Sequence, residues 1–160
     1  MESIVSHSLA CYNKRKNVLS MNLEEQQQHI LSGAMYNDLT PELVEAREKT
    51  VFLTNRYNAS FGQPASERQA ILKEVLKSVG KNAHFDPTFR CEFGYNISIG
   101  DNFYANFDCV MLDGGGIEIG NNVLLGPRVG LYTSNYALDA WERNKRPAMP
   151  SRLRLATMSG

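Results

Sequence analysis

The chain has 160 residues, and its 17 basic side chains balance 17 acidic ones. This length suits one domain with a small appendage, and the zero net charge excludes an overall field that would attract nucleic acid or an anionic membrane. No apolar run reaches the roughly 20 residues that a membrane span needs, and residues 1–20 lack the apolar core of a secretory signal. We therefore expect a cytoplasmic protein that binds a small molecule or a protein partner, with no role for nucleic acid or membrane.

The three cysteines, Cys11, Cys91 and Cys109, are odd in number and widely scattered. They form neither a disulfide framework nor the paired spacing of a zinc site. We expect them to be thiols in a reducing cytosol. No other part of the sequence has the ligand spacing of a metal site, so no metal is predicted.

The N-terminal half of the sequence predicts helices after an extension without periodicity, residues 1–21. The polar run Leu23–Leu31 suits a short helix that ends at Gly33, because glycine readily terminates helices. A second helix is expected over residues 40–58. It begins with a threonine that can cap the first amides and a proline that fits the first turn, and apolar residues follow at steps of three and four.

A third helix is expected to begin at Ser66, which forms a capping-box pattern with Gln69, and to run to Val79. Gly80 would end it. Residues 22–80 are therefore predicted to form a small helical cap. Its apolar faces are too small for an independent core, so we expect the cap to pack on the remainder of the chain.

After Gly80 the apolar residues follow a period of six, in two triplets: Ile99, Ala105 and Met111, then Ile119, Leu125 and Leu131. Glycine often follows the apolar residue, and asparagines stand near the expected corners, where a positive φ is needed. This repetition predicts a hexapeptide parallel β-helix, in which three hexapeptides make one triangular coil. An ordinary meander with Gly-Asp-Asn turns remains an alternative. The period alone leaves the handedness open.

Residues 140–160 have no six-residue period and no glycine before Gly160. Their basic, proline-broken composition is typical of a disordered tail or of a frame-shifted end. We therefore predict an incomplete β-helix over residues 81–139 with about two coils, followed by an irregular basic tail at 140–160. The last coil would then expose unpaired strand edges.

Three stretches carry a specific resemblance: LSGAMYNDLTPELVEAREKT, FRCEFGYNISIGDNFYANFDCVMLD and IEIGNNVLLGPRVGLYT. Together they resemble the maltose, galactoside and nodulation O-acetyltransferases, from about Leu31 to Arg143. The resemblance implies a left-handed parallel β-helix with a helical N-terminal cap. It also implies transfer of an acetyl group from acetyl-coenzyme A to a sugar hydroxyl, and a homotrimer with active sites between neighbouring β-helices.

The resemblance further implies a set of acceptor-binding residues: Asp38, Arg47, Glu92, Tyr104, Asn106 and Asp113. The carboxylate of Asp38 suits paired sugar hydroxyls, because it accepts two hydrogen bonds. Arg47 matches a sugar-contacting arginine, and Glu92 stands where relatives carry a shorter polar residue. Tyr104 and Asn106 match an aromatic wall and an amide that orients the reacting hydroxyl.

Simpler interpretations of the same residues stay open. Asp38 can be a favourable charge at a helix N-terminus, and Arg47 a solvated helix residue. Asn106 can be a corner asparagine. Asp113 matches an acceptor-side carboxylate, but it can equally form the turn before three glycines. That glycine triplet lacks the lysine and the following helix of a phosphate loop.

One position departs from the family pattern. A hydroxyl is a poor nucleophile at neutral pH, so acetyl transfer needs a base. The resemblance places a histidine soon after Leu-Tyr-Thr, yet Tyr136 stands there. A phenol with an ordinary pKa near 10 is a weak base at pH 7. The three histidines, His7, His29 and His84, are expected to be surface or packing residues.

Two functional interpretations therefore remain. The first is an acetyl-coenzyme A-dependent sugar O-acetyltransferase. The second is a truncated, non-catalytic remnant, or a sugar-binding subunit that joins a relative's trimer, without the base and the donor groove. Whether such a chain is an active enzyme, and which sugar is the acceptor, the sequence leaves undecided.

Overall fold

The computed structural model describes residues 21–136, 140–143 and 147–157. The predicted N-terminal extension therefore lies, except for Met21, outside the described residues. Three helices form the cap: α2 (Leu23–Leu31), α3 (Pro41–Ala59) and α4 (Ala65–Val75). The first two match the predicted helices. Helix α2 begins with a capping box between Asn22 and Glu25.

Two details of the cap differ from the prediction. Thr40 precedes α3 but makes no capping hydrogen bond, and its hydroxyl donates to Gln26 Oε1 at 2.7 Å. The predicted capping box of α4 is also absent: Pro64 is the N-cap, without a side-chain bond, and the Gln69 amide donates to the Gly80 carbonyl at 2.7 Å. Both side chains serve tertiary contacts instead of their own helix.

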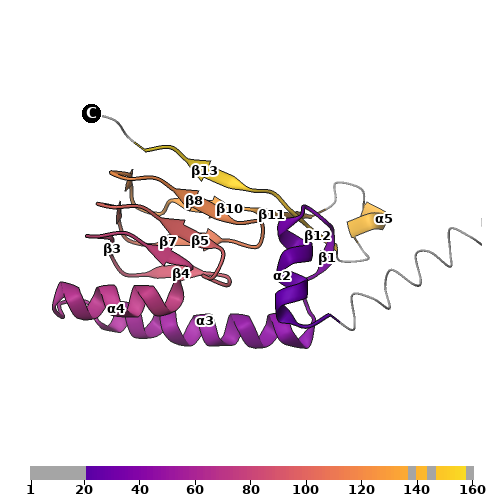
Figure 1. The fold of residues 1–160 in the computed structure, drawn as a ribbon, viewed down its shortest axis with the longest axis horizontal. Coiled ribbons are helices and arrows are strands. Elements are labelled where there is room, and N and C mark those ends of the chain that lie inside the picture. The colour runs from indigo at the N-terminus through magenta and orange to yellow at the C-terminus, as the bar shows by residue number, and fades with distance from the viewer. Residues whose placement is uncertain (1–20, 137–139, 144–146, 158–160) are drawn as a thin grey trace, which may run out of the picture.

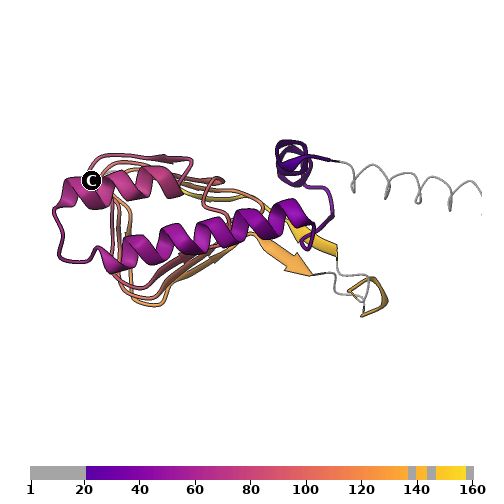
Figure 2. The same ribbon diagram turned by 90° about the horizontal axis from the view of Figure 1, so that it is seen from below.

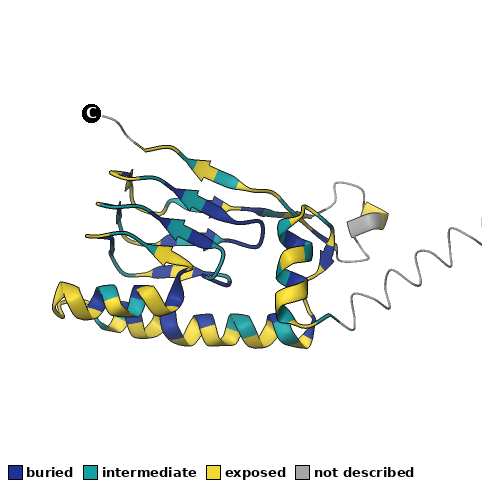
Figure 3. Cartoon of the chain, viewed as in Figure 1, coloured by how far each residue is buried: buried dark blue, intermediate teal, exposed yellow. Residues whose placement is uncertain are grey.

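Helices α3 and α4 lie side by side across one end of a triangular stack of strands (Figures 1 and 2). Their buried faces, which include Leu53 and Tyr57 of α3 and Leu72 of α4, join the main hydrophobic core. The opposite faces of both helices are exposed (Figure 3). The prediction that the cap packs on the remainder of the chain is thus confirmed.

The stack consists of three parallel sheets. The first coil contains β2 (Ser78–Val79), β3 (His84–Phe85) and β4 (Phe89–Cys91); the second contains β5 (Ile97–Ile99), β6 (Tyr104–Ala105) and β7 (Cys109–Leu112); the third contains β8 (Ile117–Ile119), β9 (Leu124–Leu125) and β10 (Gly130–Tyr132). Each strand pairs with its counterpart one coil on. The two predicted triplets stack in register: Ile99 on Ile119, Ala105 on Leu125, Met111 on Leu131.

The β-helix begins earlier than predicted. Ser78 and Val79 belong to β2, which pairs with β5, and α4 ends already at Val75. Val79, Phe85 and Cys91 have the same six-residue spacing as the later triplets. In the sequence, the apolar stripe before Gly80 favours a helix, so this spacing was not recognised. In the structure, strand pairing with β5 outweighs the local helical preference of residues 78–79. The structure therefore has three coils where about two were expected.

The predicted irregular tail is wrong for its described part. After β10 come β11 (Ser134–Tyr136), the short helix α5 (Ala140–Arg143), β12 (Pro147–Pro150) and β13 (Leu153–Leu155). β12 lies antiparallel between β11 and β1 (Tyr36–Asn37). β13 returns to the stack as a fourth layer on β8. The otherwise unpaired edge of β8 offers backbone hydrogen-bond partners, so β13 can pair with it although residues 153–155 do not continue the six-residue period.

Polar ladders run along the corners of the coils. Asn82, Asn102 and Asn122 all have φ near +57°, with values of 58°, 55° and 57°. The Asn82 amide donates to Asn102 Oδ1, and the Asn102 amide donates to Asn122 Oδ1, each at 3.0 Å. A second ladder runs through Asp101 and continues into the fourth layer, where Thr157 Oγ1 accepts from Asn121 N at 3.1 Å. Asn102 and Asn122 thus hold the predicted corner positions, and Asn82 occupies the same position in the first coil.

Candidate functional site

The cap, the coils and the β11–β12 arm meet at the end of the stack near β1 (Figure 1). Polar side chains from these parts contact one another there. We call Tyr36, Asp38, Arg47, Glu92 and Ser134 the cap–coil cluster. Each comes from a different segment: β1, the loop after it, α3, the turn that follows β4, and β11. The strand pairing of β1 with β12, and of β12 with β11, brings the first and last of these segments together.

Arg47 joins the two carboxylates of the cluster. Its Nη1 lies 3.4 Å from Glu92 Oε1 and 4.0 Å from Asp38 Oδ2, and its Nη2 donates to the Asp38 carbonyl oxygen. The guanidinium also lies over the Phe93 ring, 5.6 Å from its centre. The three charged side chains are about a quarter exposed or less. They therefore remain reachable from solvent while a ring and a backbone carbonyl fix the guanidinium.

Asp113 lies beneath this cluster and is fully buried. Its Oδ1 accepts from the backbone amides of Glu92 and Phe93 at 3.1 and 2.8 Å, and its Oδ2 accepts from Asn96 N at 3.4 Å. Burial raises the pKa of Asp113, against the opposing effect of these amide donors. The carboxylate thus anchors the loop that carries Glu92.

The first glycine of the triplet gives this corner its shape. A Cβ on Gly114 would lie 2.6 Å from Ser134 Oγ and 2.7 Å from Tyr36 Oη, so any side chain at this position would require these two hydroxyls to move. These two hydroxyls are themselves 3.3 Å apart. The nearest atom of Glu92, Oε2, is 3.7 Å from the same point. Glycine at 114 therefore lets the arm and β1 close over Glu92.

Glu92 is electrostatically unusual. Its Oε2 is buried and has no hydrogen-bond partner among the described residues. Burial raises the pKa of Glu92 to about 7, and the charge of Asp113 adds to this rise, while Arg47 opposes it. Asp38 adds a smaller rise. Glu92 is therefore a carboxyl group that exchanges its proton near neutral pH.

Tyr104 and Asn106 lie elsewhere, on β6 and the corner after it. The Tyr104 hydroxyl donates to Asp86 Oδ2 at 2.6 Å, which is the main reason that the pKa of Asp86 is lowered. Asp86 Oδ1 lies 3.0 Å from His84 Nε2, and the rings of His84 and Tyr104 stack with centres 5.8 Å apart. The Asn106 side chain accepts from Phe107 N at 2.8 Å. One chain does not bring this group into contact with the cap–coil cluster.

Sequence reasoning missed His84 and Asp86 as partners of Tyr104. The signal was available: residues 84–86 read His-Phe-Asp one coil before Tyr-Ala-Asn, and β3 pairs with β6 through His84 and Tyr104. Arg68 Nη1 lies 3.1 Å from His84 Nδ1. Both ring nitrogens are thus engaged, which suits the predicted packing role for His84.

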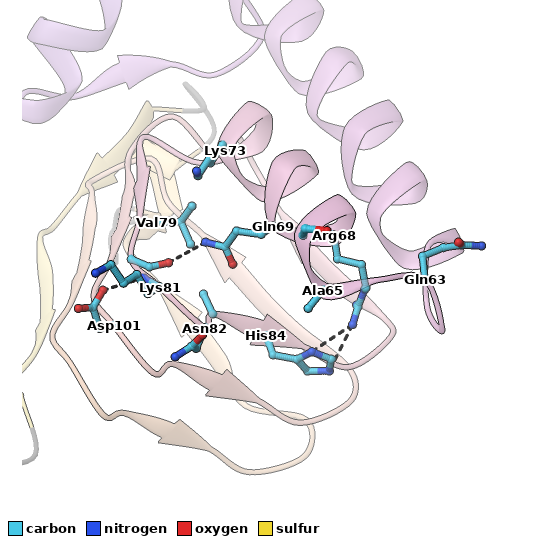
Figure 4. A pocket seen from close by; sticks show the side chains of 13 residues that line it. Gln63, Ala65, Arg68, Gln69, Lys73, Val79, Lys81, Asn82, His84 and Asp101 are labelled. Atoms are coloured by element: carbon cyan, nitrogen blue, oxygen red, sulfur yellow. Dashed lines mark hydrogen bonds between the residues drawn. The ribbon is translucent and has the colours of Figure 1, made fainter.

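A cavity of about 790 Å³ lies between α4 and the corner of the first coil. Arg68, Gln69, Lys73, Lys81 and His84 are among its lining residues (Figure 4). It contains no residue of the cap–coil cluster and none of the six predicted acceptor-side residues. Beside this cavity, the Gln69 amide donates to the Gly80 carbonyl and joins α4 to the first coil, whereas Lys81 N donates to Asp101 Oδ1 and joins the first coil to the second.

Tyr136 lies in β11 opposite Ala148, and its side chain is outside the described part of the structure. His29 Nε2 lies 3.2 Å from the Met35 carbonyl oxygen, whereas His7 is not described. Within residues 21–136, 140–143 and 147–157, no group of three metal-ligating side chains could hold an ion. No helix of that part is long and apolar enough to cross a membrane.

Comparisons with known proteins agree with this architecture. Residues 29–80 match the family pattern described as the maltose acetyltransferase hexapeptide capping motif. Nodulation protein L of Rhizobium meliloti is 37% identical over 118 residues, which cover 74% of this chain and 64% of that protein. The galactoside O-acetyltransferase of Escherichia coli is 34% identical over 109 residues, covering 68% of this chain and 54% of that protein. The chain thus spans less than two thirds of the length of these curated relatives.

Solved structures extend the likeness to three dimensions. A maltose O-acetyltransferase from Clostridium difficile superimposes with a TM-score of 0.76 at 38% identity, covering 83% of this chain and 70% of that one. A galactoside acetyltransferase in complex with coenzyme A gives a TM-score of 0.73 at 30% identity, covering 79% and 64%. These likenesses confirm the predicted left-handed parallel β-helix with its helical cap.

Proposed function

Because the chain belongs to the family of maltose, galactoside and nodulation-type O-acetyltransferases, we propose that it transfers an acetyl group from acetyl-coenzyme A to a hydroxyl group of a sugar. The observation that carries this proposal is the cap–coil cluster. In this cluster the carboxylates of Asp38 and Glu92 lie within 4.0 Å of the Arg47 guanidinium, and each of the three residues comes from a separate segment. The related galactoside acetyltransferase was solved with coenzyme A, which supports acetyl-coenzyme A as the donor.

The cluster has the chemistry that a sugar requires. Carboxylate oxygens accept hydrogen bonds from neighbouring hydroxyls, and a guanidinium donates up to five. The Phe93 ring under Arg47 keeps the guanidinium in place, so less conformational entropy is lost when a sugar binds. We assign Asp38, Arg47 and Glu92 to the acceptor end of the site. Asp113 supports them from below through the backbone of residues 92–96.

We also propose that the working form is a homotrimer. Tyr104 lies in the β3–β6–β9 sheet and Asn106 at the corner after β6, whereas the strands next to the cap–coil cluster belong to other sheets. In a trimer, a neighbouring copy would supply Tyr104 and Asn106 opposite this cluster. The two described cysteines, Cys91 and Cys109, are buried free thiols. This suits a reducing compartment, and we propose the cytoplasm.

The test of this proposal is a thiol-release assay. The purified chain is mixed with acetyl-coenzyme A and with glucose, maltose or a galactoside, and free coenzyme A is measured over time. We expect acceptor-dependent thiol release, a strong loss in Arg47→Ala, and no loss in the control Arg56→Ala, whose exposed side chain pairs with Glu74. Light scattering should give three times the chain mass of 18.0 kDa. Absence of acceptor-dependent release with every sugar would overturn the proposal.

A second function is favoured by one observation, Tyr136 at the position where the family pattern has histidine. The chain would then be a sugar-binding subunit without its own turnover. Calorimetric sugar binding without thiol release would support this alternative. A gain of turnover in Tyr136→His would then identify position 136 as the site of the lost base.

A further inference from the structure

We propose that Glu92 is the base that removes the proton from the acceptor hydroxyl. The inference rests on the proposed acetyl transfer, and it adds a catalytic residue of this chain to that reaction. It is carried by the placement of one carboxyl group: one oxygen is held by a cation, and the other has no hydrogen-bond partner in the part of the chain that the structure describes.

The two oxygens of Glu92 have different surroundings. Oε1 lies 3.4 Å from Arg47 Nη1, which orients the carboxyl group. Oε2 has no donor within hydrogen-bonding distance among the described residues, so no N–H group competes with a proton there. Rotation about the last torsion of glutamate is soft, so either oxygen can be turned toward a ligand. This pairing of an oriented oxygen with a free one is what a base requires.

Asp113 provides the contrast within the same site. Both of its oxygens accept backbone amides, and its side chain is fully buried. A proton on Asp113 would face these amides, and no substrate can reach it. Glu92 keeps 13% of its side chain exposed. Of these two neighbouring carboxyl groups, one is therefore structural and the other is available for proton transfer.

Charges of both signs face Glu92 and act on its pKa in opposite directions. Asp113 and Asp38 are carboxylates beside it, and Arg47 is the cation that opposes them. Two phenols also face it, Tyr36 of β1 and Tyr95 of the following loop, and both have a raised pKa. The pKa of Glu92 of about 7 is in the range where a base is most effective at neutral pH.

The chemical step balances with acetyl-coenzyme A as the second substrate. The Glu92 carboxylate takes the proton of the acceptor O–H group, and the oxygen attacks the thioester carbonyl carbon. A C–O bond forms, and the C–S bond breaks. The proton then passes from the Glu92 carboxyl group to the departing thiolate, which gives the coenzyme A thiol and restores the carboxylate.

The test measures kcat/KM between pH 5 and pH 9 for the wild-type chain, Glu92→Gln and Glu92→Asp, with acceptor binding followed in parallel by calorimetry. For wild type we expect kcat/KM to rise through a midpoint near pH 7 and then level off. Glu92→Gln should lose about 10²–10⁴-fold in turnover and lose this rise, while it still binds the sugar. Glu92→Asp should keep the rise at a lower rate. Glu74→Gln, which removes an exposed carboxylate paired with Arg56, is the matched control.

The outcomes separate the two proposals. Wild-type turnover with an unchanged rate and pH profile in Glu92→Gln overturns the role of Glu92 and leaves acetyl transfer standing. Absence of turnover in wild type overturns acetyl transfer, and the role of Glu92 with it. If circular dichroism shows that Glu92→Gln does not fold, Glu92→Asp decides: a flat profile contradicts the proposal.

Discussion

The coils and the cap–coil cluster satisfy their polar groups in opposite ways. In the coils, each residue meets its own counterpart, as Asn82 meets Asn102, 20 positions on. In the cluster, five segments each contribute one side chain, and Glu92 Oε2 is left without a hydrogen-bond partner among the described residues. A repeated structure can satisfy every layer with the same bond, since each coil contacts only its neighbours. An assembly of unlike segments can leave one group unsatisfied, and that group is available for function.

The largest expected effect comes from the coil interior. Phe103 is fully buried in the second coil, with its ring centre 5.0 Å from that of Phe85. Phe103→Ala should lower the free energy of unfolding by about 3–5 kcal/mol, because it removes the ring and leaves a cavity. Urea denaturation followed by circular dichroism measures this loss. A loss under about 1 kcal/mol would mean that the coils collapse around the gap.

A smaller loss is expected at the base of the cluster. In the wild type, backbone amides donate to both oxygens of Asp113. Asp113→Asn keeps the shape of the side chain but replaces one of these acceptor oxygens by an NH₂ group, which faces an N–H donor. We expect a loss of about 3 kcal/mol, because buried donors lose their charged acceptor. The matched control is Asp101→Asn, at a carboxylate whose bond to Lys81 N is exposed. Equal losses in the two variants would mean that the buried bonds of Asp113 contribute no more stability than the exposed bond of Asp101.

The effect of Glu92 on stability depends on pH. Its folded-state pKa of about 7 lies above the ordinary value of 4.5, so the folded chain binds the extra proton. Wild-type stability should therefore fall as pH rises from 4.5 to 7. Glu92→Gln removes this fall and should be more stable than wild type at pH 8, by on the order of 2–3 kcal/mol. Denaturation at pH 4 and pH 8 measures the difference. If Glu92→Gln is less stable than wild type at pH 8, burial does not destabilise the Glu92 carboxylate, and the prediction is wrong.

The smallest effect is expected in the corner ladder. Asn102→Gly keeps the positive φ of 55° but loses two amide bonds, and should cost about 1 kcal/mol. Asn102→Ala should cost more, because alanine is also strained at this φ. Thermal unfolding of both variants gives the order. The reverse order would show that the backbone conformation contributes nothing at this corner.

Local patterns were reliable where a segment interacts with itself or with its repeats. Helices α2 and α3 and the two apolar triplets were predicted because amphipathic spacing and the six-residue period are written in neighbouring residues. The end of α4 and the strands β12 and β13 were missed, because their partners are distant: β5, β1 and β8. Local propensity is outweighed wherever an unpaired edge is available.

The candidate site divides in the same way. The resemblance grouped six residues as one set: Asp38, Arg47, Glu92, Tyr104, Asn106 and Asp113. A single chain brings together the first three, with Asp113 bound to the backbone beneath them, but Tyr104 and Asn106 lie elsewhere. Tyr104 belongs instead with Asp86 and His84, a contact set by the coil register. The role of each residue in acceptor binding stays a prediction.

By itself, the sequence determined the family, the β-helical period and the identity of the charged residues, because these depend on residue type and spacing. Only the tertiary structure decided which charges meet and how deeply each is buried. The proton affinity of Glu92 is the clearest case: nothing in Cys-Glu-Phe-Gly predicts it. It follows from burial, from Asp113 below and from Arg47 on a separate helix, and electrostatic effects of this kind depend on distance and solvent exclusion.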